Sequence, residues 1–117
     1  MATIKDVEID LMPTEGMKEE AERYQGWKAD GEAGGTEVAA RRATQILSGD
    51  ELSPDVVIAM SAWFARHEVD KQAEGFSPGE NGYPSPGRVA WAAWGGDPGQ
   101  SWADGKADRI KEIQDRS

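Results

Sequence analysis

The sequence contains no cysteine and no long apolar run, and both absences narrow what the protein can be. Without cysteine, disulfide bonds, thiolate metal sites and cysteine nucleophiles are excluded. No segment approaches the roughly 18 consecutive apolar residues that mark a membrane span, so no association with a membrane is expected. The start of the chain is acidic and lacks the apolar stretch of a secretory signal, so none is predicted.

Hydrophobic residues are also scarce, at 38% of 117 residues, but five tryptophans are among them. A chain of this length predicts one domain. Each buried aromatic side chain removes roughly 150–250 Å² from water, so a few tryptophans contribute on the order of 10 kcal/mol before conformational entropy is subtracted. We therefore expect a small fold whose core depends on its indole rings.

Basic residues are outnumbered by acidic ones, 13 to 22, which gives a net charge of −9. The acidity is concentrated in residues 1–37, which contain ten acidic and four basic side chains. Such a surface repels phosphates, so direct binding to nucleic acid is not expected. Two interpretations stay open: a solubilising face, or an imitation of nucleic-acid phosphates that occupies a basic groove on another protein.

Residues 1–13 are predicted to be an extended arm, separate from a single helical domain at residues 14–117. Val7, Ile9 and Leu11 alternate with acidic residues, which is the pattern of a β-strand. This strand could be a flexible arm, an edge of a small hairpin, or a segment that docks on a partner by adding to the edge of its sheet. In the last case, deletion of residues 1–13 would leave the fold intact and abolish assembly.

The rest of the chain predicts an all-α fold of four to five short helices around a tryptophan-rich core. Helix-capping residues or prolines at the first helical position mark the starts. The expected helices cover residues 15–29, 37–47, 54 to about 71–74, 86–94 and 98 onward, the last capped by Asp97. Between the third and fourth, a long Gly/Pro loop is pinned by Phe76 and Tyr83. Trp63, Trp91 and Trp94 should form the central cluster, with Arg88 over an aromatic ring in a cation–π contact.

Three strings carry a resemblance to a known family: GGTEVAARRATQIL, LSPDVVIAMSAWFARHEVDK and GYPSPGRVAWAAWGGDPGQSWAD. Across residues 16–105 the chain resembles a small helical module found in many tailed-bacteriophage proteins. The most specific pieces are Arg66–Glu68 with Lys71, and the string from Ala90 to Asp97. The resemblance implies a phage or prophage origin and, since some such modules are connected with head assembly, a virion role; it implies no established activity.

The charged cluster Arg66, His67, Glu68, Asp70 and Lys71 is the candidate site. His67 and Lys71 share one helix face at the i, i+4 spacing, and a lone histidine beside acids could bind a partner, act as a base or hold a metal. No metal-binding spacing accompanies it, however, and no catalytic residue, metal or cofactor is predicted. The structural alternative places His67 at the end of the apolar ladder, donating to a backbone carbonyl or to Asp97.

Trp91 and Trp94 have a second interpretation as a stacking platform for bases or a peptide, although their i, i+3 spacing favours the core. The glycine-rich turn after them, Gly95 to Gly99, lacks the lysine and the strand of a phosphate-binding loop. It is predicted to be a sharp turn between helices.

The sequence therefore predicts a non-enzymatic protein of a phage that binds other phage or host proteins, in the virion or the host cytoplasm. The leading form is a head-associated or decoration component; a homo-oligomer or assembly on a capsid lattice stays open. The candidate partner-binding residues are Val7, Ile9, Leu11, Glu19, Glu20, Arg66, His67, Glu68 and Lys71. The alternative is an acidic inhibitor of a host nucleic-acid-binding or defence enzyme, with Glu8, Asp10, Glu15, Glu19, Glu20 and Glu22 standing in for phosphates. A third hypothesis, a metal-dependent hydrolase, would use His67, Glu68 and Asp97.

Overall fold

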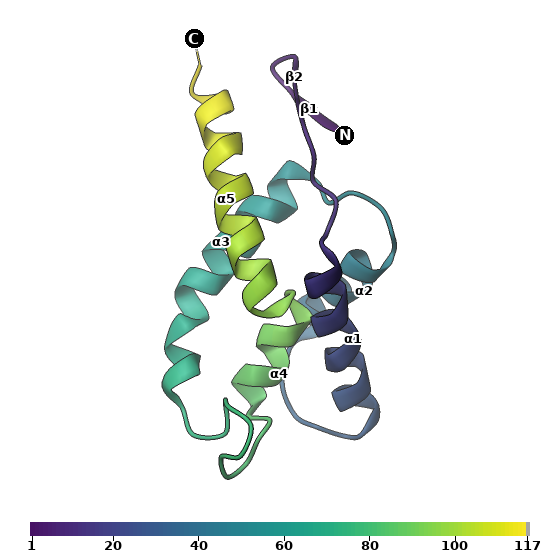
Figure 1. The fold of residues 1–117 in the computed structure, drawn as a ribbon, viewed down its shortest axis with the longest axis vertical. Coiled ribbons are helices and arrows are strands. Elements are labelled where there is room, and N and C mark those ends of the chain that lie inside the picture. The colour runs from purple at the N-terminus through teal and green to yellow at the C-terminus, as the bar shows by residue number, and fades with distance from the viewer. Residues whose placement is uncertain (117) are drawn as a thin grey trace.

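A computed structural model describes residues 1–116, which form five α-helices, one 3₁₀ helix and a two-stranded hairpin (Figure 1). The predicted all-α fold is confirmed, including the long loop between the third and fourth helices. In chain order the elements are β1 (Ala2–Ile4), β2 (Val7–Ile9), α1 (Glu15–Ala29), α2 (Glu37–Leu47), α3 (Pro54–His67), η1 (Glu68–Gln72), α4 (Pro86–Ala93) and α5 (Gly96–Gln114).

Local capping fixes where the first four α-helices begin. A hydroxyl oxygen accepts from the backbone N–H three residues later at Thr14, Thr36, Ser53 and Ser85. Proline follows directly at the first position of α3 and of α4, where its missing N–H has no helical partner to lose. The predicted starts of α1 to α4 are confirmed, because each depends on residues adjacent in the sequence.

The helices pack around a cluster of aromatic rings, as expected. Trp63 of α3 stacks on Trp94 with the ring planes 11° apart and the centroids 4.8 Å apart. Trp91 lies 5.9 Å from Trp63 and meets Phe64 edge-on at 4.7 Å. The exposed fractions of Trp63, Trp91 and Trp94 are 9%, 1% and 4%. These rings therefore belong to the core, and the stacking platform for bases or a peptide is wrong.

Residues 1–13 are not a free extended arm. β1 and β2 pair antiparallel, with Ala2 opposite Ile9, through a turn in which Lys5 and Asp6 both have positive φ. Leu11 is fully buried and Ile9 is 7% exposed. Of the interpretations left open by the sequence, the small hairpin is the observed one, and it packs onto the same core as the helices.

Several polar contacts hold the hairpin and the segment after it against the helical body. The backbone N–H of Leu11 donates to Glu51 Oε2 at 2.9 Å, and the N–H of Leu52 donates to the Leu11 carbonyl at 3.1 Å. Lys5 Nζ donates to the carbonyls of Gln114 and Arg116 at the end of α5. The expectation that removing residues 1–13 leaves the fold intact is therefore at odds with the structure.

The loop at residues 73–85 folds back on α1. Phe76 is 8% exposed, and Tyr83 meets Trp27 edge-on with the ring centroids 5.8 Å apart. The N–H of Ser85 donates to the Gly75 carbonyl at 2.8 Å, which closes the base of the loop. The predicted pinning of this loop by Phe76 and Tyr83 is confirmed, and it brings the loop next to the C-terminal end of α1.

Candidate functional site

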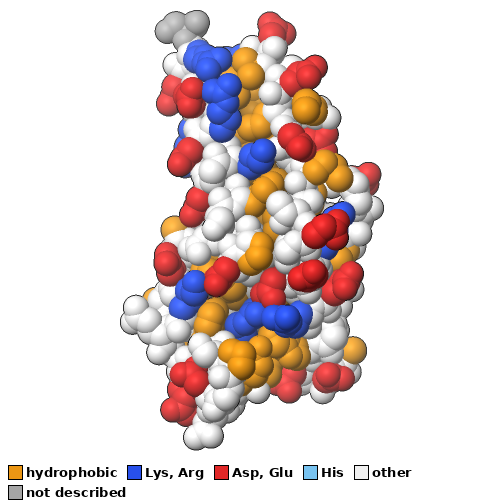
Figure 2. Space-filling model, viewed as in Figure 1, with side chains coloured by type: hydrophobic (Ala, Val, Ile, Leu, Met, Phe, Trp, Pro, Cys, Tyr) orange, Lys and Arg blue, Asp and Glu red, His pale blue; other side chains and the backbone are white. Residues whose placement is uncertain are grey.

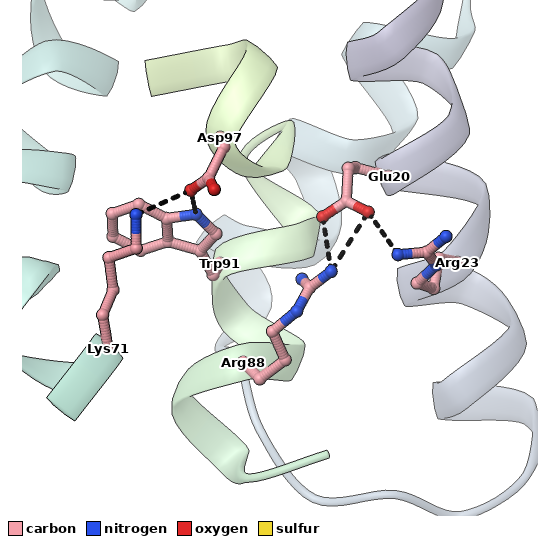
Figure 3. A network of polar contacts seen from close by, with 6 residues as sticks. All are labelled: Glu20, Arg23, Lys71, Arg88, Trp91 and Asp97. Atoms are coloured by element: carbon pink, nitrogen blue, oxygen red, sulfur yellow. Dashed lines mark hydrogen bonds and ion pairs between the residues drawn. The ribbon is translucent and has the colours of Figure 1, made fainter. Parts of the chain in front are cut away.

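A buried ion pair joins α1 to α4. Arg88 Nη2 lies 2.8 Å from Glu20 Oε1, and each of the two side chains is only 11% exposed. Arg23 Nη1 lies 2.8 Å from the other oxygen of Glu20 and is itself half exposed. Figure 3 shows the Glu20 carboxylate between the two guanidinium groups. Because both charges of the inner pair are removed from water, removing one partner would leave the other uncompensated.

Aromatic rings enclose the Arg88 guanidinium. Its central carbon lies 5.1 Å from the Trp27 ring centroid and 5.8 Å from that of Phe76, which confirms the expected cation–π contact. Arg88 Nη1 is buried and has no hydrogen-bond partner among residues 1–116. We call Trp27, Phe76, Tyr83 and Arg88 the Arg88 surface; Trp27 and Tyr83 are half-buried and form its outer edge.

A second polar centre lies at the start of α5. Asp97 Oδ1 accepts hydrogen bonds of 2.9 Å from Trp91 Nε1 and from Lys71 Nζ (Figure 3). Lys71 Nζ also lies over the Trp91 ring, 5.0 Å from its centroid. Burial acts to raise the pKa of Asp97, but the hydrogen bonds from Lys71 and Trp91 outweigh it and the pKa is lowered. The carboxylate is therefore ionised at neutral pH.

This arrangement corrects the predicted role of Asp97. The residue at the N-cap position of α5 is Gly95, in the left-handed region at φ 104°, and Asp97 lies inside the first turn. Since the chain reverses at Gly95, α5 begins two residues earlier than predicted. The Asp97 side chain is thereby directed to Trp91 and Lys71 rather than to the helix end or to His67.

A pocket of about 220 Å³ lies between these two polar centres. Its polar lining comes from Glu19, Glu20, Arg88 and Asp97, and its apolar lining from Gly16, Phe76, Trp91 and Pro98. It thus brings together α1, the loop, α4 and the start of α5. In Figure 2, a band of basic side chains lies above a hydrophobic patch in the lower half of the molecule, with acidic side chains around both.

The predicted cluster around His67 is only partly brought together. The His67 ring stacks on Trp63, 4.4 Å between centroids and 23° between planes, and its Nδ1 lies 3.3 Å from Asp70 Oδ2. His67 therefore pairs with Asp70 and not with Asp97. Arg66 and Glu68 are exposed, and Lys71 belongs to the Asp97 centre. Within residues 1–116, no three His, Asp or Glu side chains are placed to hold one metal ion.

His67 is also the outer member of a stacked column. Trp63 and then Trp94 follow it, and the Arg42 guanidinium carbon lies 5.0 Å from the Trp94 ring centroid. A shallow, mostly apolar groove runs past this column, between it and the glycine segment before α2. Stacking on Trp63 and the contact with Asp70 together account for the position of His67.

The predicted N-terminal site residues divide by burial. Ile9, Leu11 and Glu20 are buried, so they contact the interior of this chain and are not part of a free surface. Val7 is half-buried, and Glu19 is exposed. Trp27 and Phe76 beside Arg88 could not be recognised directly from the sequence, because the contact joins three segments. The expected position of Arg88 over an unspecified ring was the one indication.

None of the helices described over residues 1–116 has the length and apolarity needed to cross a membrane. Comparisons with protein-family models, with curated proteins and with solved structures gave no match to this chain.

Proposed function

We propose that this chain is a non-enzymatic bacteriophage protein that works by binding other proteins, with a head-associated or decoration role in the virion as the leading form. The phage origin depends on the resemblance of residues 16–105 to a module of tailed phages. The mode of action depends on the surface chemistry of the folded chain.

The observation that carries the proposal is the Arg88 surface. Tryptophan, tyrosine and arginine are the residues that most often dominate the energy of protein–protein interfaces. Here Trp27 and Tyr83 form the outer edge, held by an edge-on contact with each other and by a cation–π contact between Trp27 and Arg88, which is itself only 11% exposed. Because these contacts already restrict the side chains, they would lose little further conformational entropy when a partner binds there.

Quantitative mass spectrometry of purified virions tests the virion role. We expect the chain at many copies per particle, and fewer copies of a Tyr83→Ala variant, because that change removes the outer ring of the Arg88 surface. Val69→Ala is the matched control, since Val69 is 66% exposed and lies outside this surface. A chain that is abundant in infected cells and missing from washed particles would rule out the virion role.

The acidic N-terminal third favours a second candidate, an inhibitor that imitates nucleic-acid phosphates. Five of the six acidic residues proposed for this role are exposed: Glu8, Asp10, Glu15, Glu19 and Glu22. Glu20 does not fit, because Arg88 and Arg23 already neutralise it. Binding by this mechanism would weaken steeply with added salt and would compete with DNA for the target enzyme. A complex that is insensitive to salt would exclude it.

A further inference from the structure

We infer that the pocket between α1, α4 and the start of α5 binds a lysine or arginine side chain of the protein partner. This inference rests on the proposed function, because it assumes that the chain acts through contacts with another protein. Beyond the proposed function, it specifies the kind of side chain that the partner inserts into the pocket.

The apolar part of the pocket suits the stem of a long basic side chain. Phe76, Trp91 and Pro98 line it, and the volume of about 220 Å³ is enough for one such side chain but small for a larger group. Lysine and arginine commonly lay their methylene groups along apolar surface and keep the charged end in a polar setting. The pocket offers both environments within one side-chain length.

The polar part of the pocket contains carboxylate oxygens that take part in no ion pair or hydrogen bond within residues 1–116. Three carboxylates and one guanidinium line it, and the guanidinium is already paired with Glu20. Glu19 forms no ion pair within residues 1–116, and Asp97 uses only Oδ1, for Trp91 and Lys71. Glu19 and Asp97 Oδ2 are therefore the groups left to receive a cation, in a protein whose net charge of −9 attracts basic partners.

Lys71 shows that the pocket wall already accommodates an ammonium group. Its Nζ is held by a carboxylate oxygen of Asp97 and by the face of the Trp91 ring, the two kinds of contact that a partner cation would use. Lys71 does not itself line the pocket, but the two residues that hold its ammonium group, Trp91 and Asp97, both do.

A titration of the full chain followed by ¹H–¹⁵N NMR tests the inference. The probe is acetyl-Gly-Lys-Gly-amide, and its comparator carries norleucine, which has a similar stem without the charge. We expect the lysine peptide to shift the Trp91 indole N–H and the Gly16 amide signals in a saturable manner, and the norleucine peptide to leave both unchanged. Equal effects of the two peptides, or no saturable shift at all, would overturn the inference.

Two charge-matched variants separate the pocket from general acidity. Glu19→Gln and Glu22→Gln remove the same charge from the same helix at exposed positions, but only Glu19 lines the pocket. Loss of one partly exposed ion pair should weaken peptide binding roughly threefold in Glu19→Gln and leave Glu22→Gln unchanged. Equal weakening in both would contradict the assignment. No phage component enters this titration, so a chain missing from virions that still passes it would refute only the virion role.

Discussion

The indole nitrogen of Trp91 donates a 2.9 Å hydrogen bond to Asp97 Oδ1, across the turn that joins α4 to α5. The same oxygen receives Lys71 from the 3₁₀ helix that follows α3. One carboxylate oxygen therefore connects α4, α5 and η1. The tryptophan that it contacts is only 1% exposed. The direction of the last helix is set by this contact together with the left-handed Gly95.

Asp97 should make the stability of the protein depend on acid pH. Its folded-state pKa is below the ordinary value of 3.8, so its contribution to the free energy of unfolding is present above that value and is lost as the pH falls through the folded pKa. Asp97→Asn should therefore lower stability at pH 7 and flatten the decline below about pH 4. Urea unfolding at pH 7 and pH 2.5 measures both effects. Asp108→Asn, at an exposed position of α5 without an ion pair in residues 1–116, should change the stability at pH 7 by less than about 0.5 kcal/mol.

Arg88 should matter far more to stability than Arg23, although both contact Glu20. Replacing Arg88 by alanine leaves the Glu20 carboxylate buried with only a half-exposed partner, and we expect a loss of about 3 kcal/mol. Arg23→Ala removes a partly exposed pair and should cost about 0.5 kcal/mol. Chemical denaturation of the two variants compares them directly. Similar losses would mean that Glu20 is better solvated than its burial indicates.

The first 13 residues should contribute to folding as well as to any contact with a partner. Leu11→Ala creates a cavity in the core and should destabilise the protein by about 2–5 kcal/mol. The neighbouring Met12 is 37% exposed, and Met12→Ala should change stability by less than about 0.5 kcal/mol. Thermal unfolding followed by circular dichroism distinguishes them. A Leu11→Ala variant as stable as the parent would restore the interpretation of this segment as a separate arm.

Two glycines of α5 should respond to alanine in opposite directions. A Cβ at Gly105 meets no atom within 4 Å, so Gly105→Ala should raise stability by about 0.5–1 kcal/mol through its better helix propensity. At Gly99 the added carbon would lie 2.6 Å from the backbone oxygen of Trp94, which cannot move without shifting the α4–α5 turn. Gly99→Ala should therefore destabilise the protein by about 1–3 kcal/mol. Melting temperatures of the pair provide the measurement.

Features that depend on neighbours in the sequence were predicted in detail, whereas contacts between distant segments were predicted only in outline, as for the tryptophan cluster, or not at all. The starts of α1 to α4 follow from Thr14, Thr36, Ser53 and Ser85, whose hydroxyls bond three residues away. The burial of the indole rings followed from helical spacing. The hairpin was harder to recognise, because its turn places Lys5 and Asp6 at positive φ without the Asn-Gly or Asp-Gly pair typical of such turns.

The residues of the candidate site were harder to predict from the sequence than the helices, because their contacts join distant segments. Glu20 has the sequence context of a solvated acidic helix start, yet it pairs with an arginine 68 residues away. Asp97 has the sequence context of a helix cap, but the reversal at Gly95 moves it inside the helix. His67 and its charged neighbours were predicted as the candidate site because charged residues are frequent in that stretch of sequence. The pocket, in contrast, is assembled from four separate segments.

The link from Lys5 to the last carbonyls of α5 has a practical consequence. It holds the beginning and the end of the described chain at one pole of a molecule 51 Å long, while the 73–85 loop and the C-terminal end of α1 lie toward the other pole (Figure 1). A tag, a fused domain or a surface tether attached at either end would leave from the same side and point the opposite tip outward. Immobilised through either end, the protein should present Trp27 and Tyr83 to solution.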